Sequence, residues 1–290
     1  MPRTLVLSML ALLPALATAA GAQAPVERRV LAERDVSLRI FNLAGSVRLI
    51  GWDRDSVVVT GTLGKGARLS MGGTPSAMKL GLEGADDPEL APPAVLEVRV
   101  PRTARVWVKT STAPVTVEGV RGGLDLYTVS GAIAVGGDPR ELRAESMDGD
   151  VTVTGAPAWA RLETATGAVT LRGGGADVGL TSVSGALVLT GGTVERARLE
   201  TVTGAVTFGS AMVRGGSYDV ETHGGRVELA VPAALGVELE ASTLHGTIDG
   251  PVVGRDTRRG NDGRKFSLVT GDAGARITIR TFKGPIVLRR

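Results

Sequence analysis

The chain has 290 residues, enough for one large domain or two small ones. Hydrophobic residues make up 43% of it but aromatic residues only 3%, beside 41 glycines and 14 prolines, and this composition suits thin β layers better than one deep core. Cysteine is absent, which excludes disulfides and thiolate metal sites, and the formal net charge is +3.

The first 22 residues have the pattern of an export signal. Arg3 supplies a positive start, "LVLSMLALLPALA" (5–17) is the apolar stretch, and small residues follow. We expect cleavage after Ala22, because a cut after Ala24 would place Pro25 just beyond it. The apolar run is shorter than the ~20 residues that a membrane span needs, so the mature chain is expected to be exported without a transmembrane segment.

Residues 23–107 are expected to form an irregular β cap at the N-terminus. "GWDRDSVVVTG" (51–61) and "LEVRVPRTARVWVKTS" (96–111) have the composition of strands. The Gly-, Ala- and Pro-rich connection between them (63–94) has room for a ragged hairpin. Such a cap would cover a sheet edge that otherwise invites aggregation.

Residues 108–290 are dominated by one repeated phrase, of which "LETATGAVTL" (162–171) and "LETVTGAVTF" (199–208) are two copies. Its central glycine, or the alanine that replaces it once, recurs in ten units: Gly45, Ala113, Gly131, Gly149, Gly167, Gly185, Gly204, Gly225, Gly246 and Gly284. From Ala113 to Gly185 the step is always 18, and the later steps are 19, 21, 21 and 38. A loop excursion at 251–276 supplies the extra residues of the last step.

Apolar residues alternate with polar ones on both sides of each glycine, which predicts two short strands joined by a turn or bulge. A unit this small cannot bury its apolar face alone, so the units are expected to stack in parallel. The position three before the glycine is Thr, Ser or Asn in all ten units, and we expect it to point inward or lie at a corner with its hydroxyl bonded to backbone. The constant step favours an all-β parallel β-helix, or β-solenoid, with rungs of 18–21 residues over an antiparallel sandwich.

The chain resembles the bacterial DUF4097 family of β-strand-repeat proteins, which is related to the GIN-type head-domain adhesins and described as putative adhesins. The resemblance rests on "VRLIGWDRDSVVV" (47–59), "VRVPRTARVWVKTSTAPVTVEG" (98–119), the tandem units and "ITIRTFKGPIVLRR" (277–290). It implies a parallel β-solenoid exported to, or displayed at, the bacterial envelope. It brings no catalytic residues with it.

The residue that follows each Thr or Ser defines the first candidate binding surface, the apolar stripe: Val129, Met147, Val183, Val202, Leu244 and Phe282. Ala165 and His223 occupy the same position. Strict alternation sends this position outward, where exposed apolar side chains indicate a partner. A strand bulge before the glycine would instead turn it inward, and the sequence leaves both orientations open.

A second candidate is the acidic column, which precedes each Thr or Ser: Glu145, Glu163, Glu200 and Glu221. Its two interpretations are a carbohydrate-binding or carbohydrate-cleaving face and an ordinary solvated face. The two histidines, His223 and His245, are expected in consecutive rungs as exposed turn residues without a metal. We therefore expect no catalytic residues, no metal and no cofactor.

A basic patch near the C-terminus is the third candidate: Arg255, Arg258, Arg259, Arg264 and Lys265. It sits on an otherwise acidic body and suits anionic envelope polymers, while few aromatic residues disfavour nucleic acid. The expected function is a non-catalytic adhesion, scaffold or binding module at the cell envelope, with an envelope polymer or surface protein as partner. The alternatives are a carbohydrate-active or polysaccharide-binding β-helix and an envelope-stress sensor that works through a partner.

Overall fold

Side chains alternate between buried and exposed along almost every strand, as the sequence pattern predicts. The computed structural model describes residues 24–83, 93–258 and 263–290. The predicted export signal, its cleavage site and Arg259 lie outside these residues. The described residues contain no helix long and apolar enough to cross a membrane.

The strands of the N-terminal part are β1 (Ala24–Leu31), β2 (Ser37–Asn42), β3 (Gly45–Trp52), β4 (Ser56–Leu63), β5 (Arg68–Thr74), β6 (Ala77–Glu83), β7 (Ala94–Pro101) and β8 (Arg105–Thr110). Those of the middle part are β9 (Val115–Glu118), β10 (Gly123–Thr128), β11 (Ile133–Gly136), β12 (Glu141–Ser146), β13 (Val151–Thr154), β14 (Trp159–Thr164), β15 (Val169–Arg172) and β16 (Gly175–Ser182). The C-terminal part contains β17 (Leu187–Thr201), β18 (Val206–Thr222), β19 (Val227–Ala230), β20 (Val237–Thr243), β21 (Ile248–Asp249), β22 (Arg255–Arg258), β23 (Arg264–Val269), β24 (Ala275–Thr281) and β25 (Ile286–Arg289).

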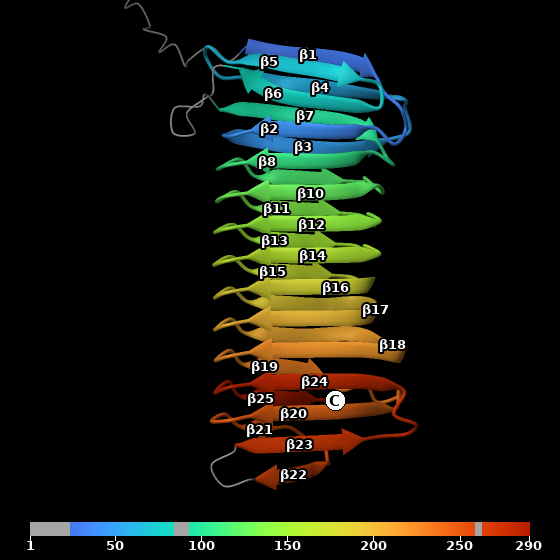
Figure 1. Ribbon diagram of the computed structural model, residues 1–290, viewed down its shortest axis with the longest axis vertical. Helices are drawn as coiled ribbons and strands as arrows, with labels where there is room; N and C mark the ends of the chain where they lie inside the picture. Colours follow the sequence, from blue (N-terminus) through green and yellow to red (C-terminus); the bar gives the residue numbers. More distant parts are fainter. Residues whose placement is uncertain (1–23, 84–92, 259–262) are drawn as a thin grey trace, which may run out of the picture.

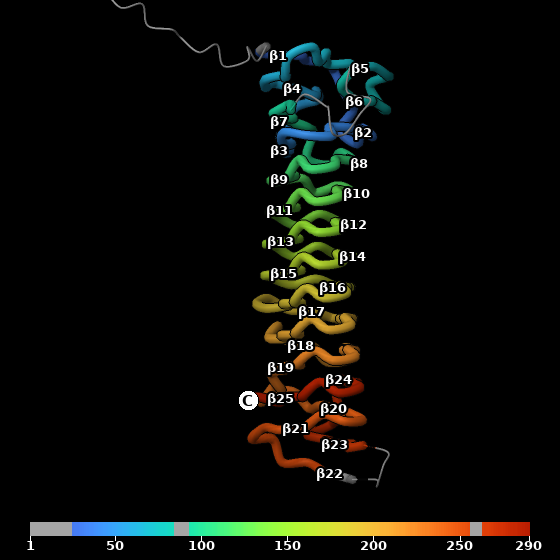
Figure 2. Tube along the Cα trace, turned by 90° about the vertical axis from the view of Figure 1, so that its left-hand side faces the viewer, coloured from blue at the N-terminus to red at the C-terminus, as the bar shows by residue number. Residues whose placement is uncertain are grey.

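These strands form two ladders that face each other across a common core (Figure 2). The first ladder stacks β2, β8, β10, β12, β14 and β16, and the second stacks β3, β9, β11, β13 and β15. The strands β17 and β18 each run through both ladders. The fold is thus all-β, a mostly parallel sheet that curls round on itself until it is nearly closed, which confirms that part of the prediction.

Each layer contributes one strand to each ladder, and the register follows the repeat of the sequence. Thr128 pairs with Ser146 and Ser146 with Thr164, a step of 18 residues each time. The later pairs Ser182 with Thr201 and Thr201 with Thr222 have steps of 19 and 21. The repeated phrase therefore places equivalent residues directly above one another.

At both ends of the stack the order of layers in space differs from their order in the chain. The β2–β3 layer lies between the β6–β7 and β8–β9 layers. The β24–β25 layer lies between the β18–β19 and β20–β21 layers, so that the C-terminus is inside the stack (Figure 1). Residues 37–52, which were assigned to the irregular cap, thus belong to the regular stack, and Thr222 neighbours Thr281 rather than Thr243.

Antiparallel strands close both ends of the stack. At the N-terminal end β4 pairs with β1 and β7, and β5 forms a hairpin with β6. At the C-terminal end β23 pairs with β20 and β22. The residues of the predicted ragged hairpin and of the predicted loop excursion therefore supply the outermost strands.

The core between the ladders is a column of aliphatic side chains, because the inward positions of each layer are Val, Leu, Ile and Ala. Tyr218 and Phe208 are the largest fully buried side chains in the described chain, and their ring centroids lie 5.6 Å apart. The Tyr218 hydroxyl donates to the Val194 carbonyl at 2.7 Å and accepts from the Val213 N–H at 2.8 Å. Burial raises the pKa of this tyrosine, so it remains a neutral core residue.

Candidate binding face

A buried Thr or Ser ends the first-ladder strands from β8 onward and fixes the direction of the chain there, and Asn42 takes this place in β2. The Thr128 Oγ accepts a hydrogen bond from the Gly131 N–H at 3.0 Å, and Thr164 and Ser182 bond in the same way to Gly167 and Gly185 at 3.2 and 2.9 Å. The same hydroxyls donate to carbonyl groups of the preceding layer. This agrees with the inward or corner position that the sequence predicts.

The next residue points into solvent, which decides the orientation that the sequence left open. The side chains of the apolar stripe are between 36% and 59% exposed, Leu244 least and Met147 most. Backbone hydrogen bonds join neighbouring members, as between the Met147 N–H and the Val129 carbonyl and between the Val202 N–H and the Val183 carbonyl. The stripe is therefore continuous along the stack.

An aromatic contact marks the C-terminal end of the stripe. The rings of His223 and Phe282 are stacked at 4.6 Å, and His245 meets Phe282 edge-on at 5.2 Å. The prediction that the two histidines occupy consecutive layers is wrong, because β24 brings Phe282 between them. No group of three or more His, Asp or Glu side chains that could hold a metal occurs among the described residues.

The acidic column runs parallel to the stripe on the outer face of the first ladder. Arg143 pairs with Glu145 and Arg198 with Glu200, each arginine two residues before its partner in the same strand. Between the column and the stripe lie two shallow grooves of 540 and 330 Å³, with the hydroxyl residues at their base. One wall of this surface is thus acidic and the other apolar.

The basic patch falls on the C-terminal hairpin. Arg255 and Arg258 are in β22, and Arg264 and Lys265 are in β23, where adjacent side chains point to opposite faces of the strand. The Lys265 ammonium lies 3.2 Å from the Glu240 carboxylate. Arg264 and Lys265 therefore lie on opposite faces of the hairpin.

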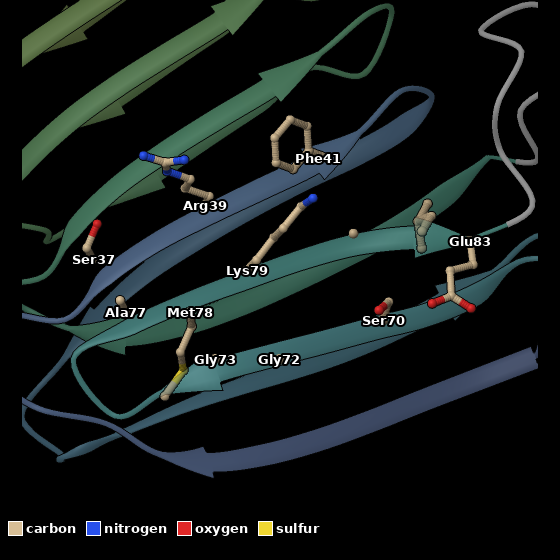
Figure 3. Close-up of a pocket in the computed structure, with 12 residues that line it drawn as sticks. Ser37, Arg39, Phe41, Ser70, Gly72, Gly73, Ala77, Met78, Lys79 and Glu83 are labelled. Atoms are coloured by element: carbon tan, nitrogen blue, oxygen red, sulfur yellow. The ribbon is translucent and has the colours of Figure 1, made fainter.

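A groove at the N-terminal end of the same face was not predicted from the sequence. Its two parts, of 720 and 430 Å³, share Ser37, Arg39 and Phe41, and the first part is drawn in Figure 3. In their own units Phe41 and Tyr127 occupy the position that is Glu in the acidic column. Extending the alignment of that position to the earlier units would therefore have identified both aromatic residues. Burial raises the pKa of the Asp125 carboxyl at the edge of this groove, and nearby Arg143 offsets only part of the rise.

No family model and no curated protein matches the chain. Among solved structures, a putative adhesin from Parabacteroides distasonis is 10% identical with a TM-score of 0.47, and one from Bacteroides fragilis is 12% identical with a TM-score of 0.43. Each alignment covers 93% of this chain and 98% of the other. A putative lipid binding protein from Parabacteroides distasonis is 11% identical with a TM-score of 0.41, over 92% of this chain and 96% of the other. At these identities and TM-scores no function transfers to this chain.

Proposed function

We propose that the chain is a non-catalytic β-solenoid, exported to the bacterial envelope, that binds a surface protein along its apolar stripe. The observation that carries the proposal is the row of exposed Val, Met, Leu and Phe side chains beside the acidic column, in which Ala165 and His223 take two of the places. Contiguous exposed apolar surface on a folded protein generally marks an interaction site. The DUF4097-like sequence pattern supports the same role.

The chemistry of the two walls defines the partner. Apolar side chains of the partner would cover the stripe, and its basic side chains would meet the acidic column. Addition of a partner strand would be confined to the ends of the stack, where β1 and β22 are outermost strands, and would leave the stripe uncovered. We therefore infer a contact between side chains along the length of the stack.

A catalytic role for the acidic column is less well supported. Glu145 and Glu200 form ion pairs with Arg143 and Arg198, so both carboxylates are already engaged by a neighbouring guanidinium. A catalytic carboxyl needs its oxygens free to reach the substrate. These ion pairs favour a surface that recognises charge over one that transfers protons.

The test replaces Val183 and Val202, in the middle of the stripe, by Asp. We expect co-sedimentation of residues 23–290 with outer-membrane fractions to weaken by about tenfold or more, because a fully buried valine contributes ~1.5 kcal/mol or more. Val95→Asp with Val269→Asp is the matched control, since these valines are 48% and 67% exposed outside the stripe. Normal binding by the Val183 and Val202 variant would refute the stripe as the contact. Salt-sensitive binding that the Val183 and Val202 variant keeps in full would assign the contact to charged side chains instead of the stripe.

A further inference from the structure

We propose that the N-terminal groove is a second binding site and that its ligand is an acidic polysaccharide, one that carries uronic-acid carboxylates. The groove crosses the outer face of β5, β6, β2, β8 and β10. It does not involve Val183, Val202 or any other member of the apolar stripe. The inference therefore stands or falls independently of the proposed function.

Three aromatic side chains form a platform on this face. The ring centroids of Phe41 and Trp107 lie 4.9 Å apart with their planes at 57°, and those of Trp107 and Tyr127 lie 5.9 Å apart at 45°. All three rings are half-buried and point away from the core, in a chain that has only 3 Trp, 2 Tyr and 4 Phe. Their electron-rich faces suit the C–H groups on the flat side of a sugar ring.

The strands and glycines of this region hold the groove open. β2 is hydrogen-bonded on both sides, to β6 and β8, so the platform has a rigid base. Gly72 and Gly81 line the groove, and a Cβ added at either would have nothing within 4 Å among the described residues. The space above β5 and β6 is therefore left open by the absence of side chains (Figure 3).

The cations beside the platform give the groove its preference for an anion. Within residues 24–83, 93–258 and 263–290, no carboxylate forms an ion pair with Arg39, Lys79 or Arg105. The Lys79 ammonium lies 5.1 Å from the centre of the Phe41 ring, toward which it extends in Figure 3. Farther along the same face Arg143 and Arg198 are neutralised by their glutamates. An unpaired guanidinium is the side chain best suited to grip a carboxylate.

The remaining groups favour a glycan over a single-stranded nucleic acid. Glu83 and Asp125 lie in the two parts of the groove, where their carboxylates can accept hydrogen bonds from sugar hydroxyls. The aromatic rings contact one another, so bases have no gap between them in which to insert. A hexose is about as long as the ~4.8 Å step between strands, so a glycan running along the stack would place successive sugars on successive layers.

The test is calorimetric titration of residues 23–290 with polygalacturonate, with neutral dextran and oligothymidylate as competing ligands. We expect binding to polygalacturonate alone, weakened about tenfold or more by Arg39→Ala with Lys79→Ala and by Trp107→Ala. Trp107→Phe keeps a ring and should retain part of the affinity. Arg172→Ala with Lys283→Ala is the control, since it removes two exposed cations elsewhere and should leave binding unchanged.

Three results would overturn the proposal. Equal binding of dextran would mean that the cations are not used, and tighter binding of oligothymidylate would make this a nucleic-acid site. Absence of polygalacturonate binding by a folded wild-type chain would remove the site altogether. The Val183→Asp and Val202→Asp variant should bind polygalacturonate normally, which keeps this test separate from that of the stripe.

Discussion

At the scale of single residues, the stack depends on a glycine that permits adjacent backbones to approach closely. A Cβ built on Gly185 would lie 1.7 Å from the carbonyl oxygen of Gly167 and 2.9 Å from the Ser182 hydroxyl. Gly149, Gly204 and Gly225 are equally restricted by the glycine one layer before them. At these four positions the glycine is thus required by the distance between layers, since its own φ is not in the left-handed region.

Replacing Gly185 by Ala should therefore destabilise the stack by about 1–3 kcal/mol or more, because backbone must shift to admit one methyl group. Gly209→Ala is the matched control, since its added Cβ would meet only the Thr190 Cγ2 at 3.5 Å, and it should be neutral or stabilising by up to about 1 kcal/mol. Urea denaturation of both variants checks the difference. Equal stability of the two would contradict the close-approach explanation.

At the scale of strands, the sequence predicts pairing better than it predicts the outer surface. The 18-residue step aligns Thr128, Ser146 and Thr164, and the structure pairs these residues. The orientation of Val183 was not predictable, because it depends on how the chain turns after the buried hydroxyl. The groove at Phe41 and Trp107 was missed because those residues are far apart in sequence and meet only through the insertion of β2 between β6 and β8.

One cross-strand ion network links three strands of the first ladder. Asp177 in β16 lies 2.8 Å from Arg161 in β14 and 3.4 Å from Arg196 in β17. Burial alone would raise the pKa of Asp177, but the two arginines outweigh it and lower the pKa below 3.8. A carboxyl with a lowered pKa in the folded state stabilises the fold above its unfolded pKa, and this stabilisation is lost as the pH falls through the folded value.

We expect Asp177→Asn to reduce stability at neutral pH by up to about 1 kcal/mol, since the groups are partly solvated. The difference from wild type should shrink as the pH falls further below 3.8, because the wild-type carboxyl then becomes protonated as well. Urea unfolding of both proteins over this pH range measures the effect. A difference that stayed constant down to the lowest pH would show that Asp177 acts by packing and not by charge.

At the scale of the whole molecule, the C-terminal layer acts as an internal support. β24 pairs with β18 on one side and β20 on the other, and β25 pairs in the same way with β19 and β21. Contacts in a stacked fold are mainly between neighbouring layers, so removal of one layer separates those on either side of it. The β20–β21 layer and the β22–β23 hairpin depend on this connection.

Truncation after Gly274 should therefore disorder strands that the deletion itself does not remove. We expect β20 and β23 to lose hydrogen-exchange protection while β10 to β16 keep theirs, because only the layers beyond the gap are disconnected. Truncation after Leu288 is the control and should leave β20 protected, since it preserves the paired part of β24 and nearly all of β25. Retained protection of β20 in the shorter chain would mean that it can pair with β18 directly.

The position of the β24–β25 layer inside the stack also determines the order in which the layers can fold. Layers from β8 to β18 can assemble in chain order, because each finds its neighbour already formed. The space between β18 and β20 stays empty until β24 and β25 are in place, and its two unpaired edges are open to wrong partners in the meantime. A chain that has lost β24 and β25 thus keeps two exposed strand edges, which the intact layer covers.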